Sequence, residues 1–280
     1  MTEKDVMNRV KEHAKEVDLL GHDYFFISAQ GSWNYELGYE NSDVDTKAVI
    51  LPKFEEFVLN KDALSTTHIL SNNEHIDLKD IRVMFKNFWK QNINFLEVLF
   101  SKYCVVNPSY KEAWEQLTKL RERIAHYNNW YAVKCMCGLA TEKYAALYNP
   151  YPAQAEIVEK YGYSGKQLHH LMRMVNFLTG YVNDLSFEEC LTFFPIYEKD
   201  ILMSAKRQEF SLEEVNYFAN RSMSQLEELR TNYLSSNPNV IDEEVKQEVE
   251  KILFKILRKK FLNELREESY DEKTVYYANA

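Results

Sequence analysis

Two aspartates stand close together in the run Ser42-Asp43-Val44-Asp45. At the entry to a strand, Asp43 and Asp45 would point to one face while Val44 points to the other. Phosphoryl and nucleotidyl transfer use divalent cations that bridge phosphate oxygens, and Mg²⁺ prefers oxygen ligands such as carboxylates. The pair therefore indicates a site for two Mg²⁺ or Mn²⁺ ions, although an isolated pair of acids is more often part of a solvated surface.

A glycine–serine turn lies upstream of the two acids. Gly31 and Ser32 follow an apolar run, and the backbone N–H groups of such a turn, together with the serine hydroxyl, would hold a β- or γ-phosphate. The chain has only seven glycines, and three of them fall within the first forty residues. Since glycine allows backbone conformations that other residues avoid, this segment is where we expect the chemistry.

Short strands are expected to position the turn and the acids. The hydrophobic pattern predicts strands at residues 24–28 and 45–51 and a hairpin over residues 66–78. The turn thus follows one strand and the acids open the next, which is the ordered set of parts that phosphate chemistry requires. This order favours a function for the acids over surface decoration.

The rest of the chain shows helical periodicity, which begins at Asp80. The predicted fold class is α+β, with a mixed β-sheet flanked by helices in the N-terminal domain and an all-helical C-terminal domain. The helices expected in the second domain lie at residues 113–147, 164–179, 212–234 and 242–268. The predicted boundaries are 1–108 for the first domain, 109–270 for the second and 271–280 for a frayed tail.

The composition is typical of a globular protein. Of the 280 residues 45% are hydrophobic, which is enough for a sizeable core. With 34 basic against 43 acidic residues the net charge is −9, so any contact with nucleic acid needs a local basic patch. The charged start and the lack of a long apolar run predict a soluble cytoplasmic protein with no membrane partner. Four cysteines without paired C-x-x-C spacing are expected to be reduced thiols.

The segment GSWNYELGYENSDVDTKAVILP, residues 31–52, resembles the G-S…S-D-x-D-x-[RK]-x-x-x-x-P signature of nucleotidyltransferases of the DNA polymerase β superfamily. It is most similar to the phage and bacterial family of RNA repair pathway, ligase-associated nucleotidyltransferases. Two later segments are also similar to that family, DLKDIRVMFKNFWKQNINFLEVLF at residues 77–100 and YGYSGKQLHHLMRMV at residues 161–175. Lys47 stands where the family commonly has arginine, so the bidentate grip of a guanidinium is lost. Ala48 stands where the family commonly has glycine.

The resemblance implies an enzyme that transfers a nucleoside monophosphate from a nucleoside triphosphate such as ATP to an acceptor, with release of pyrophosphate and with two Mg²⁺ or Mn²⁺ ions. Such a site usually takes a third acid from a neighbouring strand. Asp77 is the first choice, because Ile76 and Leu78 would face the core while Asp77 faces the opposite side. Glu74 and Asp80 are alternatives, and Asp80 would equally suit the N-cap of the helix that follows. The catalytic, metal-binding residues implied are Asp43, Asp45 and Asp77.

One predicted helix carries a basic stripe. Lys166, His170 and Arg173 recur at the spacing that puts them on a single helix face. The resemblance suggests that this face binds the triphosphate or a phosphate of the acceptor, whereas a solvated helix face is the alternative. The residues expected to bind the nucleotide are Gly31, Ser32, Ser42, Lys47, Lys166, His170 and Arg173.

The sequence does not identify the acceptor, and it allows an alternative to enzymatic activity. An RNA end and a protein hydroxyl both fit the same catalytic core, so the acceptor is not named. A nucleotide-binding regulatory module that has lost turnover is the alternative to an enzyme. Asn92 and Glu97, in the segment 77–100, would either line the site or cap a helix.

Overall fold

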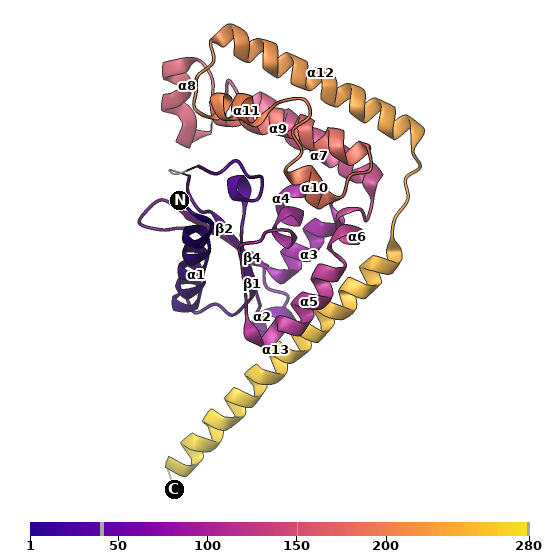
Figure 1. Ribbon diagram of the computed structural model, residues 1–280. Coiled ribbons are helices and arrows are strands. Elements are labelled where there is room, and N and C mark those ends of the chain that lie inside the picture. Colours follow the sequence, from indigo (N-terminus) through magenta and orange to yellow (C-terminus); the bar gives the residue numbers. More distant parts are fainter. Residues whose placement is uncertain (40–41, 150, 279–280) are drawn as a thin grey trace.

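The computed structural model describes residues 1–39, 42–149 and 151–278. A mixed five-stranded sheet carries flanking helices, and a helical region follows it in the chain (Figure 1). The expected α+β class is therefore confirmed. The strands are β1 (Tyr24–Ala29), β2 (Thr46–Ile50), β3 (Ser65–Ile69), β4 (His75–Asp80) and β5 (Cys104–Val106).

The sheet has the strand order β3-β4-β2-β1-β5. The predicted strands are present, and the predicted hairpin is β3 paired antiparallel with β4. The short strand β5, which the sequence pattern did not reveal, pairs antiparallel with β1. β2 pairs in parallel with β4, and this register sets Lys47 opposite Asp77. The parallel pair therefore decides which side chains of the two strands meet.

Helices bury both faces of the central strands. Every residue of β1 and β2 is buried, as expected for strands that are covered on both sides. On one face the apolar side chains of α1 (Glu3–Leu19) form a hydrophobic cluster with Ile27 and Ala48. Phe26 and Val49 face the other way, into a larger cluster formed with the helices that follow.

The helical region is built around α9 (Gly165–Val182), which is buried along nearly its whole length. It packs against α7, α10, α11 and α12. The other helices are α2 (Phe54–Val58), α3 (Ile81–Trp89), α4 (Ile93–Leu96), α5 (Lys111–Lys119), α6 (Arg121–Ala125), α7 (Asn129–Ala146), α8 (Ala155–Tyr161), α10 (Phe187–Leu191), α11 (Lys199–Lys206), α12 (Leu212–Ser236) and α13 (Glu243–Ala278). Short 3₁₀ turns are η1 (Gly31–Trp33), η2 (Glu97–Leu99), η3 (Pro108–Tyr110) and η4 (Pro152–Gln154).

The prediction of one helix over residues 113–147 is wrong, because the structure divides this segment into α5, α6 and α7. The Asn128 side chain accepts a hydrogen bond from the Tyr131 N–H group, at 2.8 Å. Asparagine at an N-cap begins a new helix even where the apolar periodicity continues. A local capping residue thus overrides the longer pattern.

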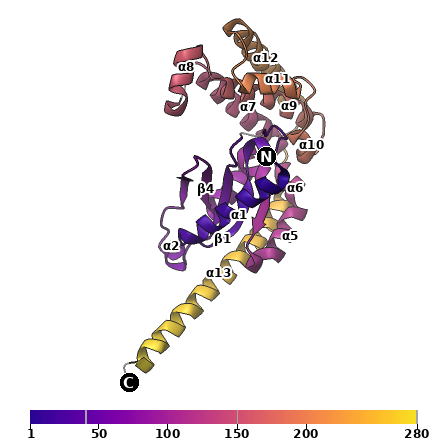
Figure 2. The same ribbon diagram turned by 60° about the vertical axis from the view of Figure 1, so that its left-hand side comes forward.

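The helix α13 continues through residues 271–278, part of the segment predicted to be frayed. No glycine or proline interrupts residues 243–278, so nothing in the local sequence ends the helix earlier. Val245, Val249 and Ile252 are buried near its start. Figures 1 and 2 show its C-terminal part projecting away from the sheet.

A shared hydrophobic core joins the sheet to the helical region. The larger cluster contains Phe26 and Val49 of the sheet together with Leu171 of α9 and Leu226 of α12. The domain boundary at residue 108 stays a sequence-based prediction. All four cysteines are free, as expected. In the described part of the chain, no helix combines the length and the hydrophobicity that crossing a membrane requires.

Candidate metal and nucleotide site

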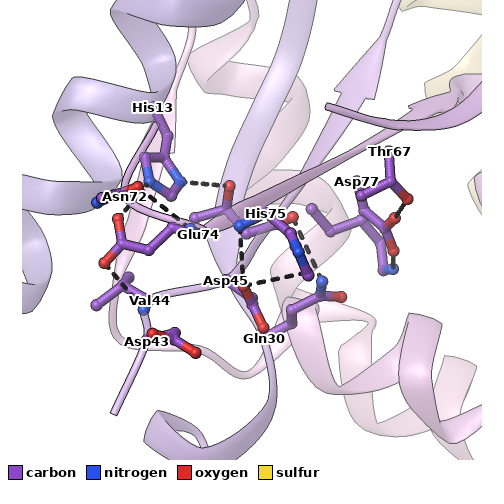
Figure 3. A network of polar contacts seen from close by, with 12 residues as sticks. His13, Gln30, Asp43, Val44, Asp45, Thr67, Asn72, Glu74, His75 and Asp77 are labelled. Atoms are coloured by element: carbon purple, nitrogen blue, oxygen red, sulfur yellow. Dashed lines mark hydrogen bonds and ion pairs between the residues drawn. The ribbon is translucent and has the colours of Figure 1, made fainter. Parts of the chain in front are cut away.

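The two acids lie in the segment that leads into β2. Val44 is fully buried between them, while Asp43 is exposed and Asp45 is half-buried. Figure 3 shows the two carboxylates turned to the same side. This arrangement follows from the alternation of side chains along extended backbone.

Hydrogen bonds tie the acids to the glycine–serine turn. The indole N–H of Trp33 donates to the carbonyl of Asp43 at 3.0 Å, and the Gln30 N–H group donates to the carbonyl of Asp45 at 2.9 Å. The His75 N–H group donates to Oδ1 of Asp45 at 2.9 Å. The turn and the acids therefore lie side by side, and one oxygen of the Asp45 carboxylate has a defined partner.

The electrostatics of the pair suit a bound cation. Burial raises the pKa of Asp45, the amide and imidazole of His75 and the charge of Lys166 lower it, and the charge of Asp43 raises it. Two nearby carboxylates, one of them partly removed from water, repel each other. A divalent cation would relieve this repulsion, and carboxylate oxygens are the hard donors that Mg²⁺ prefers.

The turn presents one of the two groups that were expected to face a phosphate. Gly31 begins η1 with a φ of 74°, a conformation that favours glycine. Its N–H group donates to Oε1 of Glu97 at 3.0 Å, so this donor is bound within the protein. The hydroxyl of Ser32 accepts a hydrogen bond from Nζ of Lys206 at 2.9 Å. The Ser32 hydroxyl, beside the ammonium group of Lys206, is therefore the group of the turn that could contact a phosphate.

Lys206, at the C-terminal end of α11, was missed by the sequence reasoning. The pKa of Lys206 is lowered to about 8, mainly by burial and by the charge of Lys166, while the charge of Asp43 opposes the change. These effects place it among the cations of α9 and close to the acid pair. No motif surrounds it in the sequence, so only the packing of α11 against α9 reveals it.

Arg173 reaches the same region from α9. Its guanidinium lies over the ring of Tyr35, 3.5 Å from the centroid. Nε and Nη1 are buried and have no hydrogen-bond partner. Tyr35 Oη and Oε2 of Glu97 are also buried without a hydrogen-bond partner, and Tyr35 interacts electrostatically with both Arg173 and Glu97. The guanidinium therefore lies in a buried polar cluster whose hydrogen bonds are incomplete.

The basic side chains around the turn lie near acids but make no direct ion pair with them. Among the side chains that the structure describes, no ion pair joins Lys166, Arg173 or Lys206 to a carboxylate. Three cations without a direct ion pair, on two neighbouring helices, favour the binding of an anion.

The three residues of the predicted basic stripe on α9 differ in their surroundings. Burial lowers the pKa of His170 well below its usual range, and the charge of Arg173 adds to the effect. The side chain is partly buried, and these surroundings favour its uncharged form. Lys166 and Arg173 are the cations of the stripe.

Lys47 is engaged with Asp77 and not with the turn. Its Nζ lies 2.9 Å from Oδ2 of Asp77 and 4.6 Å from the ring centroid of Phe95. Thr67 donates to the other carboxylate oxygen of Asp77 at 2.6 Å. The register of β2 and β4 explains this ion pair, which occupies both side chains.

The structure does not gather three acids into one metal site. Figure 3 shows Asp77 apart from Asp43 and Asp45, beside Thr67. Among the residues that the structure describes, no group of three His, Cys, Asp or Glu side chains is placed to hold a metal ion. Asp80 accepts a hydrogen bond from the Arg82 N–H group at 2.7 Å and caps α3, which confirms the alternative role expected for it.

Two further polar residues have local roles. The hydroxyl of Ser42 accepts a hydrogen bond from the Tyr39 N–H group at 3.1 Å and is buried, so it shapes the loop before the acids. The Asn92 side chain accepts from the Asn94 N–H group at 3.1 Å and caps α4. Glu97, by contrast, borders the glycine–serine turn through its bond to Gly31.

Comparison with known proteins adds little to this geometry. No protein-family model matches the chain, and no curated protein matches it either. A solved structure that does match is a nucleotidyltransferase-like protein from Exiguobacterium sibiricum 255-15, with 11% sequence identity and a TM-score of 0.31. The match covers 90% of this chain and 80% of the other. A TM-score this low does not establish a shared fold, so the function has to be argued from the site itself.

Proposed function

We propose that the chain is a metal-dependent nucleotidyltransferase. It would transfer a nucleoside monophosphate from a nucleoside triphosphate to an acceptor, an RNA end or a protein hydroxyl, and release pyrophosphate. One observation carries the proposal: Lys166, Arg173 and Lys206, which make no direct ion pair, lie beside a turn that is hydrogen-bonded to the backbone of the acid pair. Acids that suit a metal ion next to cations that suit a polyanion match the charge pattern of a metal–triphosphate complex.

The acid pair fits Mg²⁺ or Mn²⁺. Asp43 and Asp45 offer hard oxygen donors on one side of the chain, and their mutual repulsion favours a cation. Mg²⁺ is commonly held by one or two carboxylates, with phosphate oxygens and water completing its shell, so no third acid is required. Asp77 keeps its role as the partner of Lys47 in this proposal. When bound, two such ions would neutralise phosphate charge and stabilise the charge that develops during transfer.

The remaining residues would orient the triphosphate. The hydroxyl of Ser32 and the ammonium of Lys206 are already aligned with each other and would hold the β- and γ-phosphates. Arg173 would satisfy its buried donors on phosphate oxygens, and Lys166 is exposed enough to approach from solvent. These groups would stabilise the pyrophosphate as it departs, which is where the cations contribute to the rate.

The test is the release of pyrophosphate from each ribonucleoside triphosphate, with and without Mg²⁺ or Mn²⁺. Release should require the metal, and Asp43→Asn with Asp45→Asn should lower it by about 100-fold or more. Asp80→Asn is the matched control, because Asp80 caps α3 and contacts neither the turn nor the acids. Nucleotide binding without release would indicate a regulatory module, and full turnover by the double variant would refute the proposal.

The acceptor is identified by transfer of a labelled nucleotide. With a triphosphate labelled on its α-phosphate, transfer to RNA and transfer to protein are separated on a denaturing gel. Label on RNA ends would identify an RNA-modifying enzyme, and label on protein would identify a protein-modifying one.

A further inference from the structure

A buried polar side chain interrupts the apolar face with which α1 packs on the sheet. His13 is fully buried there. Burying an imidazole without partners is costly, so its contacts should be specific. The other buried residues of this face are Val6, Val10, Ala14 and Val17.

His13 bridges two segments of the candidate site (Figure 3). Its Nδ1 lies 2.9 Å from Oγ1 of Thr46, and its Nε2 lies 3.0 Å from Oε2 of Glu74. The other oxygen of Glu74 accepts a hydrogen bond from the Val44 N–H group at 3.2 Å. Arg9, one helical turn before His13, donates to Glu74 from Nε at 3.0 Å.

These contacts hold the backbone that carries the two acids. Val44 is the residue between Asp43 and Asp45, and Thr46 is the next one along the chain. The segment is therefore fastened through the amide of Val44 and through the hydroxyl of Thr46. The residue that follows Glu74 supplies the amide that binds the carboxylate of Asp45.

The charges in this network are balanced. Arg9 pairs with Glu74, so the carboxylate does not require a charged histidine. A neutral imidazole can donate from Nε2 to Glu74 and accept at Nδ1 from the hydroxyl of Thr46, which fits both distances. A network in which every member has a partner is rigid and specifies one arrangement.

We infer that Glu74 and His13 are positioning residues that set the spacing of the two metal-binding carboxylates. The inference rests on the proposed function, because it assigns the ligands of the metal to Asp43 and Asp45. The hydrogen bonds of Glu74 and His13 go to Val44 and Thr46 and not to the carboxylates of Asp43 and Asp45. The two positioning residues act through Val44 and Thr46, and loss of such outer contacts commonly weakens metal affinity by about 10-fold to 100-fold.

The test compares Glu74→Gln with Asp80→Asn. Both acids are buried, at 5% and 3% exposure, and both pair with an arginine. Glu74 directly precedes β4, and Asp80 is its last residue. Only Glu74 contacts the segment of the acid pair. Mn²⁺ binding is measured by electron paramagnetic resonance titration of each purified chain, and urea unfolding measures the stability of the same samples.

The expected result is a loss of Mn²⁺ affinity of about 10-fold in Glu74→Gln, with a change of less than about 2-fold in Asp80→Asn. His13→Asn is the second variant if Glu74→Gln does not fold, and it should weaken Mn²⁺ binding in the same direction. The inference is overturned if the folded variants of Glu74 and His13 bind Mn²⁺ as tightly as the unchanged chain. It is also overturned if the Glu74 and Asp80 variants lose the same amount of Mn²⁺ affinity.

A separate variant distinguishes this failure from failure of the proposed function. Asp43→Asn with Asp45→Asn should abolish Mn²⁺ binding. If it does while Glu74→Gln binds Mn²⁺ as tightly as the unchanged chain, only the positioning role is refuted. If the double variant binds Mn²⁺ as tightly as the unchanged chain, the metal site itself is refuted, and the positioning role with it.

Discussion

Lowering the pH should remove the stabilisation that the ionised carboxylate of Glu74 contributes. Burial alone would raise the pKa of Glu74, but hydrogen bonds with Arg9, Asn72, His13 and the Val44 amide lower it from 4.5 to about 2. At about 1.4 kcal/mol per pH unit, this difference corresponds to about 3 kcal/mol of stability. Because the folded pKa lies below the unfolded one, the contribution is complete above pH 4.5 and is lost as the pH falls toward about 2.

The assay is urea unfolding of the unchanged chain and of Glu74→Gln, followed by circular dichroism from about pH 7 down to about pH 3. Acids other than Glu74 titrate in both proteins, so their effect cancels in the difference between the two stabilities. Glu74→Gln should be less stable by about 3 kcal/mol near neutral pH, and the gap should narrow steadily below pH 4.5. A gap that is constant throughout, or smaller than about 1 kcal/mol at neutral pH, would refute the depressed pKa.

Three further predictions follow from single side chains. Burial and the charge of Lys166 lower the pKa of Lys206 to about 8. In an equilibrium binding titration, triphosphate affinity should therefore fall by up to about 10-fold per pH unit above that pH. Lys206→Arg should abolish this fall, because arginine stays charged. Asp77→Asn should cost about 3 kcal/mol in urea unfolding, because Lys47 is left buried without its partner, yet pyrophosphate release per folded molecule should stay within a few-fold. Gly31→Ala should cost about 1 kcal/mol in thermal unfolding, since a Cβ there meets no atom within 4 Å and only the positive φ is strained; an unchanged melting temperature would contradict this.

Local features of the N-terminal region could be predicted because they depend on neighbours in the chain. Apolar runs separated by turn residues indicated β1, β2 and the β3–β4 hairpin, and all are present. The alternation of side chains predicted that Asp43 and Asp45 would emerge on one side and Val44 on the other, and Val44 is buried in the structure. The cap formed by Asp80 could also be expected from the sequence, since capping involves residues only two or three positions apart.

Features that depend on register or on long-range packing were missed. The Lys47–Asp77 ion pair requires β2 and β4 to run in parallel with one particular register, which neither strand encodes alone. The lowered pKa of His170 depends on the packing of other helices around α9, which the sequence of α9 does not contain. The division of residues 113–147 into three helices was missed because an apolar period can continue across a cap.

The sequence by itself determined the α+β class, the strands around the acids and the adjacency of a glycine–serine turn to an Asp-x-Asp segment, because spacing and periodicity act over a few residues. Only the tertiary structure decided which distant side chains surround them. Lys206 lies beside Ser32 and Glu74 beside Val44 because helices and strands from separate parts of the chain pack together. Such contacts depend on packing and strand register, and a local pattern contains no information about either.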